Sequence, residues 1–76
     1  MHFQLSVFYQ GGLFLYSITS EDKQTFQFQL KSAPPDKEAP QQFNVLHPEK
    51  NVWQFDQEFD ENFKENVIRV MKRTKL

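Results

Sequence analysis

A chain of 76 residues is long enough for one domain with a single small hydrophobic core. Without any cysteine it has neither disulfides nor thiolate metal sites, and a formal net charge of −1 gives it no general attraction for polyanions. Aromatic residues make up 16% of the chain and nine of them are Phe, which is typical of a folded domain rather than a disordered chain.

We expect residues 1–76 to form one small α+β domain located in the cytoplasm. Residues 1–20 lack the basic start, apolar core and cleavage site of a signal peptide. No stretch approaches the ~20 apolar residues that a membrane span requires, so we expect no membrane association. The absence of disulfides also favours a reducing compartment for a domain of this size.

The first predicted element is a β-hairpin, because alternating apolar and polar residues flank Gly11-Gly12. Glycine at both central positions suits the primed turns of two-residue hairpins. A turn there forms these pairs on a largely apolar face: Tyr9 with Phe14, Val7 with Tyr16, Leu5 with Ile18 and Phe3 with Ser20. The pairs of the opposite face are mostly polar: Phe8 with Leu15, Ser6 with Ser17, Gln4 with Thr19 and His2 with Glu21. The pattern therefore predicts a sheet with one buried face and one wet face.

A third strand is predicted over residues 25–31, where Phe26, Phe28 and Leu30 alternate with polar residues. These three side chains share the buried face with Tyr16 and Ile18 only if the connection has an odd number of residues. A loop of three or five residues fits this condition, unless a bulge intervenes. We expect the three strands to form an antiparallel meander.

Residues 32–42 follow as a proline-rich loop. Its prolines and mixed charges disfavour both a strand and a helix interior. We interpret it as a mobile surface linker. A polyproline ligand for a partner domain is less favoured, because a PxxP spacing with a flanking Arg is missing.

A second hairpin is predicted from residues 43–46 and 52–55, which flank a turn at 47–51. Pro48 at the second turn position and Asn51 in a left-handed conformation suit a type I turn. The predicted pairs are Phe43 with Phe55 and Val45 with Trp53. The alternative is a helix that starts at Pro48 and runs through Val52, Phe55 and Phe59.

From residue 56 onward the apolar residues recur with a helical period. The stripe consists of Phe59, Phe63, Val67, Val70 and Met71. Asp56 is the predicted N-cap, and acidic residues early with basic residues late complement the helix dipole. The expected fold is an antiparallel meander of about four to five strands with this one C-terminal amphipathic helix packed on its apolar face.

Catalysis is not expected. His2 and His47 have no metal-ligand partners at a recognisable spacing, and no nucleophile motif occurs. The acidic residues are Asp56, Glu58, Asp60, Glu61 and Glu65, and stabilisation of the helix N-terminus accounts for them. The sequence predicts a protein that is not an enzyme and has no catalytic, metal-binding or cofactor-binding residues.

Surplus apolar side chains indicate a contact surface instead. The candidates are Phe8, Leu15, Leu46 and Val52 on the wet face of the sheet and Ile68 on the flank of the helix. A contiguous apolar group on a sheet face marks a contact site. Curvature of the sheet or coverage by the proline-rich loop is the alternative explanation. We expect a protein partner or a homodimer.

Nucleic-acid binding is the alternative function. The basic residues at the C-terminal end of the helix are Arg69, Lys72, Arg73 and Lys75. Together with an aromatic sheet they resemble the components that stack bases and contact phosphates. This function is not favoured, because the helix covers most Phe residues and the acidic half of the helix repels phosphates.

Overall fold

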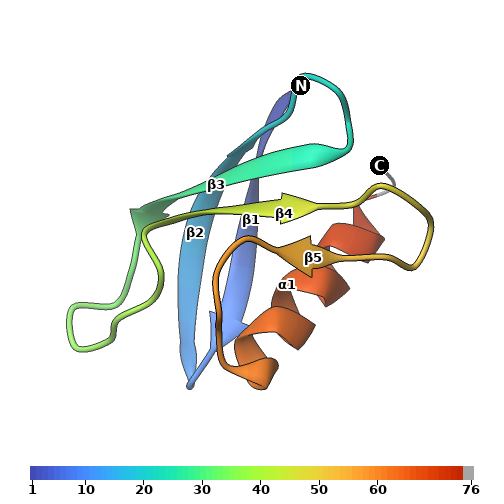
Figure 1. Cartoon of the computed structure of the whole chain (residues 1–76). Helices are drawn as coiled ribbons and strands as arrows, with labels where there is room; N and C mark the ends of the chain where they lie inside the picture. The colour runs from blue at the N-terminus through green and yellow to red at the C-terminus, as the bar shows by residue number, and fades with distance from the viewer. Residues whose placement is uncertain (75–76) are drawn as a thin grey trace.

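Five antiparallel strands and one helix follow one another along the chain, and the computed structural model describes residues 1–74 (Figure 1). The elements are β1 (His2–Tyr9), β2 (Gly12–Thr19), β3 (Thr25–Ser32), β4 (Gln42–Leu46), β5 (Gln54–Phe55) and α1 (Glu61–Arg73). Each strand pairs with the next in sequence, in the order β1-β2-β3-β4-β5. The helix packs on one face of this twisted sheet and lies along β1. The predicted fold class is confirmed.

The first hairpin turns one residue earlier than predicted. Gln10 and Gly11 are the central turn residues, with φ of 50° and 76°, and Tyr9 pairs with Gly12. The predicted strand partners are therefore wrong by two residues: Val7 lies opposite Phe14, Leu5 opposite Tyr16 and Phe3 opposite Ile18. A shift of two preserves the alternation, so every residue stays on its predicted face.

Packing explains why Gly12 belongs to the strand rather than to the turn. A Cβ on Gly12 would lie 2.8 Å from both Pro34 Cγ and Lys37 Cδ. The proline-rich loop thus approaches β2 so closely that only glycine fits. Gln10 takes the left-handed turn position instead.

The β2–β3 connection has five residues, 20–24, as the parity argument requires. Ile18 lies opposite Phe28 and Tyr16 opposite Leu30, with a register shift next to Leu15. The apolar side chains of the two strands therefore share one face.

The proline-rich loop is packed against the domain and is not a free linker. The Tyr16 hydroxyl donates to the Pro40 carbonyl at 2.6 Å, and the Leu30 amide donates to the Gln41 carbonyl at 2.7 Å. Ala39 contacts the core. Burial raises the pKa of Tyr16, which keeps its hydroxyl protonated and able to donate.

The second hairpin is shorter than predicted and its register differs. Val45 lies opposite Phe55, so the predicted pairs of Phe43 with Phe55 and Val45 with Trp53 are wrong by two residues. Trp53 lies outside the ladder, and its ring stacks on His47 with ring centroids 3.7 Å apart. His47 Nδ1 also lies 2.8 Å from the Val52 carbonyl oxygen.

The turn of this hairpin lies after Pro48. The Val52 amide donates to the Glu49 carbonyl at 3.1 Å, and Asn51 has a φ of 67°. The left-handed Asn51 is confirmed, whereas Pro48 at the second turn position is wrong. The alternative of a helix starting at Pro48 is also wrong, since Gln54 and Phe55 pair with β4.

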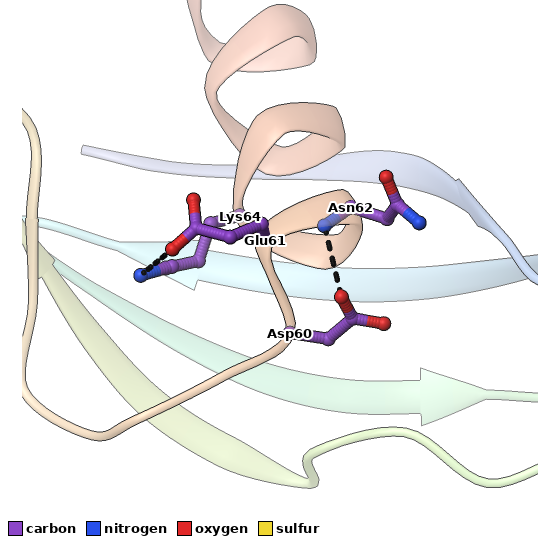
Figure 2. Close-up of polar contacts among 4 residues, drawn as sticks. All are labelled: Asp60, Glu61, Asn62 and Lys64. Atoms are coloured by element: carbon purple, nitrogen blue, oxygen red, sulfur yellow. Dashed lines mark hydrogen bonds and ion pairs between the residues drawn. The ribbon is translucent and has the colours of Figure 1, made fainter.

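The helix begins later than predicted. Its N-cap is Asp60, whose carboxylate accepts from the Asn62 amide at 3.1 Å (Figure 2). Asp56 is not the N-cap, because its carboxylate accepts from the amide and side chain of Asn44 at 3.0 and 3.1 Å. This contact extends the β4–β5 pairing by one residue. An ion pair between Lys64 Nζ and Glu61 Oε1, at 3.0 Å, follows the cap (Figure 2).

The core lies between α1 and the inner face of the sheet, and Phe43 is at its centre. The rings within 6.1 Å of Phe43 are those of Tyr16, Phe28, Phe55, Phe59 and Phe63. The helix contributes buried Phe63, Val67 and Met71, which confirms this part of the predicted stripe. Val70 is half-buried on the helix, and Phe59 packs against the core from the segment before the helix rather than from the helix itself. Such aromatic pairs add about 0.5–1.5 kcal/mol each beyond the area they bury.

Candidate interaction surface

The outer face of the sheet ends in an apolar pair next to the first turn. Phe8 of β1 and Leu13 of β2 lie directly opposite each other, with 58% and 61% of their surface exposed. Half-buried Leu15 is the next residue of β2 on the same face. We call Phe8 and Leu13 the outer pair. Two large apolar side chains that are both exposed and adjacent make this the clearest candidate contact surface.

The structure corrects the predicted membership of this surface. Phe8 is paired with Leu13 and not with Leu15, which lies opposite Ser6. Leu13 was missed because a turn at Gly11-Gly12 leaves it without an apolar partner. No local signal favours the observed turn at Gln10-Gly11, which places Phe8 opposite Leu13, because Gln rarely adopts a positive φ.

The proline-rich loop does not cover the outer pair. Gly12 and Phe14 point to the same side of β2, and Phe14 is fully buried in the core. The loop residues Pro34 and Lys37 approach Gly12 from that inner side. Coverage by this loop therefore fails to explain the apolar residues of the outer face.

Leu46 and Val52 do not join the outer pair. Leu15 lies opposite Ser32 at the end of β3, whereas Leu46 lies opposite Thr25 at its start. At about 3.3 Å per residue, these two points on β3 are roughly 23 Å apart. Half-buried Val52 lies outside the strands, in the β4–β5 connection. The predicted sheet candidates thus fall at two separate ends of the sheet.

Ile68 lies apart from the outer pair, on α1. It is half-buried and lines a shallow hollow with Glu65, Arg69 and Lys72. The charged rim around it is typical of an ordinary helix surface. Ile68 therefore adds no apolar area to the outer pair.

Three of the predicted basic residues, Arg69, Lys72 and Arg73, lie in the second half of α1. Arg69 Nη1 donates to Asn66 Oδ1 at 3.3 Å, and Lys72 and Arg73 are exposed in the last turn. Lys75 lies outside the described residues. Lys72 also lines a hollow with Lys50, His47 and Trp53. The described basic residues thus share this end of the helix.

The two histidines take part in packing and hydrogen bonding. His2 Nε2 lies 2.6 Å from the Ser17 hydroxyl, and the ring of His47 stacks on Trp53. Trp53 Nε1 is buried and has no hydrogen-bond partner among residues 1–74. Within the same residues, no three His, Asp or Glu side chains are grouped closely enough to hold a metal ion.

Tyr9 connects the first hairpin to the start of the helix. Its hydroxyl donates to Asp60 Oδ2 at 3.0 Å, and its ring contacts Phe63 edge-on at 5.1 Å. Burial, followed by the bond to Asp60, raises the pKa of Tyr9. Tyr9, the inner-face neighbour of Phe8, thus contacts the start of the helix.

No helix among the described residues is long and apolar enough to cross a membrane. Comparisons with protein family models, curated proteins and solved structures found no match to this chain.

Proposed function

We propose that this protein is a non-enzymatic protein-interaction or self-assembly module that acts in the cytoplasm. The observation that carries the proposal is the exposure of Phe8 and Leu13 as a cross-strand pair on a face that no helix within residues 1–74 covers. Full burial of each side chain is worth about 1.5–3 kcal/mol relative to its exposed state. In so small a domain, two large apolar groups left outside the core favour a role in association.

The polar outer face complements the apolar pair. Specific interfaces bury roughly 800 Å² on each partner, and the total accessible surface of this chain is 5174 Å². Two side chains are too few to supply an area of that size, so the contact must extend beyond the outer pair to its neighbours on the sheet. Exposed Gln4, Ser6 and Gln29 supply the hydrogen-bonding rim that such interfaces have around an apolar centre.

The test is the oligomeric state of the wild type and of a double variant with Phe8→Ser and Leu13→Ser. Sedimentation over a range of concentrations measures the dissociation constant. We expect self-association, or binding of a partner isolated with the wild type, to weaken at least about tenfold in the variant. Gln27→Ser, on the same face but away from the outer pair, is the matched control. A wild type that stays monomeric at high concentration and captures no partner contradicts the proposal.

Nucleic-acid binding is the second candidate, and one observation favours it. Lys50 and Lys72 flank the stacked pair of His47 and Trp53, so two cations and a large aromatic ring share one hollow. The test is salt-dependent retention on a single-stranded oligonucleotide. Lys50→Glu with Lys72→Glu should abolish retention at low salt. Retention that is unaffected by these changes, or absent in the wild type, contradicts this candidate.

A further inference from the structure

The backbone of β1 has one open side. In a two-residue hairpin the closing pair exchanges both backbone hydrogen bonds. The amide and carbonyl groups of Tyr9 and of the odd-numbered residues before it therefore point toward β2. Met1 and Ser20 exchange their bonds at 2.9 Å, which agrees with this alternation. The amide and carbonyl groups of the even residues therefore point away from the sheet. Asn66 Nδ2 approaches from that side and donates to the Phe8 carbonyl at 2.6 Å.

The free part of this edge runs from His2 to Ser6. Within residues 1–74, no hydrogen bond reaches the outward amide and carbonyl groups of His2, Gln4 and Ser6. All three residues are exposed. Proteins usually protect such an edge with Lys, Pro, a bulge or a very short strand. β1 has eight residues without Lys, Pro, Asp or Glu, whereas the other edge strand, β5, has only two residues.

We propose that two copies of this chain pair through β1, antiparallel and about a twofold axis at Gln4. The proposal rests on the self-assembly form of the proposed function, but it places the contact at the β1 edge and not at the outer pair. Gln4 then lies opposite Gln4 of the second copy, and His2 lies opposite Ser6. All of these are even positions, so free donors meet free acceptors. The two sheets become one continuous sheet of ten strands.

The inner face supports the same register. Phe3 and Leu5 are half-buried at the edge of the core. In the proposed pairing, Phe3 of each copy lies opposite Leu5 of the other, so the apolar layer continues across the edge. The paired segment has no acidic residue, Lys or Arg, and so no like charges oppose each other. The contact of Asn66 with Phe8 limits the pairing to the free stretch, which selects this register over longer ones.

A second copy fits this edge better than an unrelated extended peptide does. Peptide-binding edges obtain their specificity from pockets for alternate side chains. Here the inner side of the edge offers only Phe3 and Leu5, and these complement each other across a twofold axis. A self-complementary patch is the requirement for a symmetric dimer.

A single cysteine tests the register directly, since the chain has no cysteine of its own. Residues opposite each other in a hydrogen-bonded pair have Cα atoms ~5.5 Å apart, within the range that a disulfide spans. Gln4→Cys should therefore give a covalent dimer on mild oxidation. Gln29→Cys, which is also exposed but lies on β3, is the control and should remain mostly monomeric. Equal cross-linking of both variants, or none of Gln4→Cys, overturns the proposal.

A charged residue at the twofold axis distinguishes a failure of this proposal from a failure of the proposed function. Gln4→Lys places two like charges opposite each other and should weaken the dimer roughly tenfold, whereas Gln27→Lys on β3 should change it less than about twofold. Circular dichroism checks that both variants fold. If Gln4→Lys has no effect while the double variant of the outer pair dissociates, the edge proposal is wrong and the proposed function stands. If only Gln4→Lys dissociates the dimer, the edge proposal is supported and the outer pair is not the contact.

Discussion

Next to the first turn, both faces of the hairpin contain large apolar side chains, but these lie in different surroundings. On the inner face, Val7 and Phe14 are fully buried. On the outer face, Phe8 and Leu13 follow or precede them directly in the chain and keep more than half of their surface exposed. Alternation along a strand is the physical cause, because successive side chains point to opposite faces. In the part of the chain that the structure describes, only the inner face is covered by a helix.

Because of this difference, we expect the inner face to determine the stability of the fold and the outer face to be available for association. A fully buried aromatic side chain contributes transfer free energy and close packing to the folded state. An exposed one gains nothing comparable on folding and retains its apolar surface for a partner. The total stability expected for 76 residues is about 4–11 kcal/mol, so changes on the two faces should have clearly different effects.

The largest effect is expected for Phe43→Ala, which tests the inner face at its centre. Removal of this ring should lower the free energy of unfolding by about 3–5 kcal/mol, because five aromatic neighbours lose a packing partner. Urea unfolding followed by circular dichroism measures the change. Phe8→Ala removes the same side chain from the outer face and is the control. Equal losses for the two variants would contradict the distinction between the faces.

A smaller effect is expected at the two glycines of the first hairpin. Gly12→Ala should cost about 1–3 kcal/mol, because the new Cβ overlaps the rigid ring of Pro34. Gly11→Ala should cost about 1–2 kcal/mol for a different reason, since its φ of 76° is unfavourable for alanine. Limited proteolysis distinguishes the two causes. Gly12→Ala should expose residues 33–41 to cleavage, and Gly11→Ala should not.

Tyr16→Phe tests the contact between the inner face and the loop. The loss of the hydrogen bond to Pro40 should cost about 1–2 kcal/mol at neutral pH. Burial raises the pKa of Tyr16 in the folded state, so folding opposes its ionisation. The raised pKa therefore means that the folded state is favoured while the hydroxyl is protonated. This contribution to stability is present below the ordinary pKa of 10.0 and is lost as the pH rises above it. Phe cannot ionise, so the free energy of unfolding should fall less at alkaline pH in the variant than in the wild type. Urea unfolding curves at several pH values measure this. An equal pH dependence of stability in the two proteins would contradict the assignment of this alkaline loss to Tyr16.

The smallest effect on stability is expected for Phe8→Ser and Leu13→Ser. Both side chains are exposed, so each change should alter the free energy of unfolding by no more than about 0.5 kcal/mol. The measurement is made at a concentration where the wild type is monomeric. A loss comparable to that of Phe43→Ala would mean that the outer pair belongs to the core.

Alternation predicted the faces of the sheet correctly. Val7, Phe14 and Phe28 are buried where the pattern places them, and the odd length of the β2–β3 connection follows from parity alone. The helical spacing of Phe63, Val67 and Met71 can likewise be recognised from the local sequence alone. The outer surface was predicted only in part: Phe8 is exposed, whereas Leu46 lies at the other end of the sheet.

The sequence by itself determined which side of each strand is apolar, because that property has a period of two and is unchanged when the register shifts by two. Only the tertiary structure decided the registers and the start of the helix. Pro34 and Lys37 pack on Gly12, which moves the first turn, and Asn44 binds Asp56, which delays the helix. The partners in these contacts are at least 12 residues apart in the chain, so no local pattern contains them. The pairing of Leu13 with Phe8 follows from the first contact and therefore also required the folded molecule.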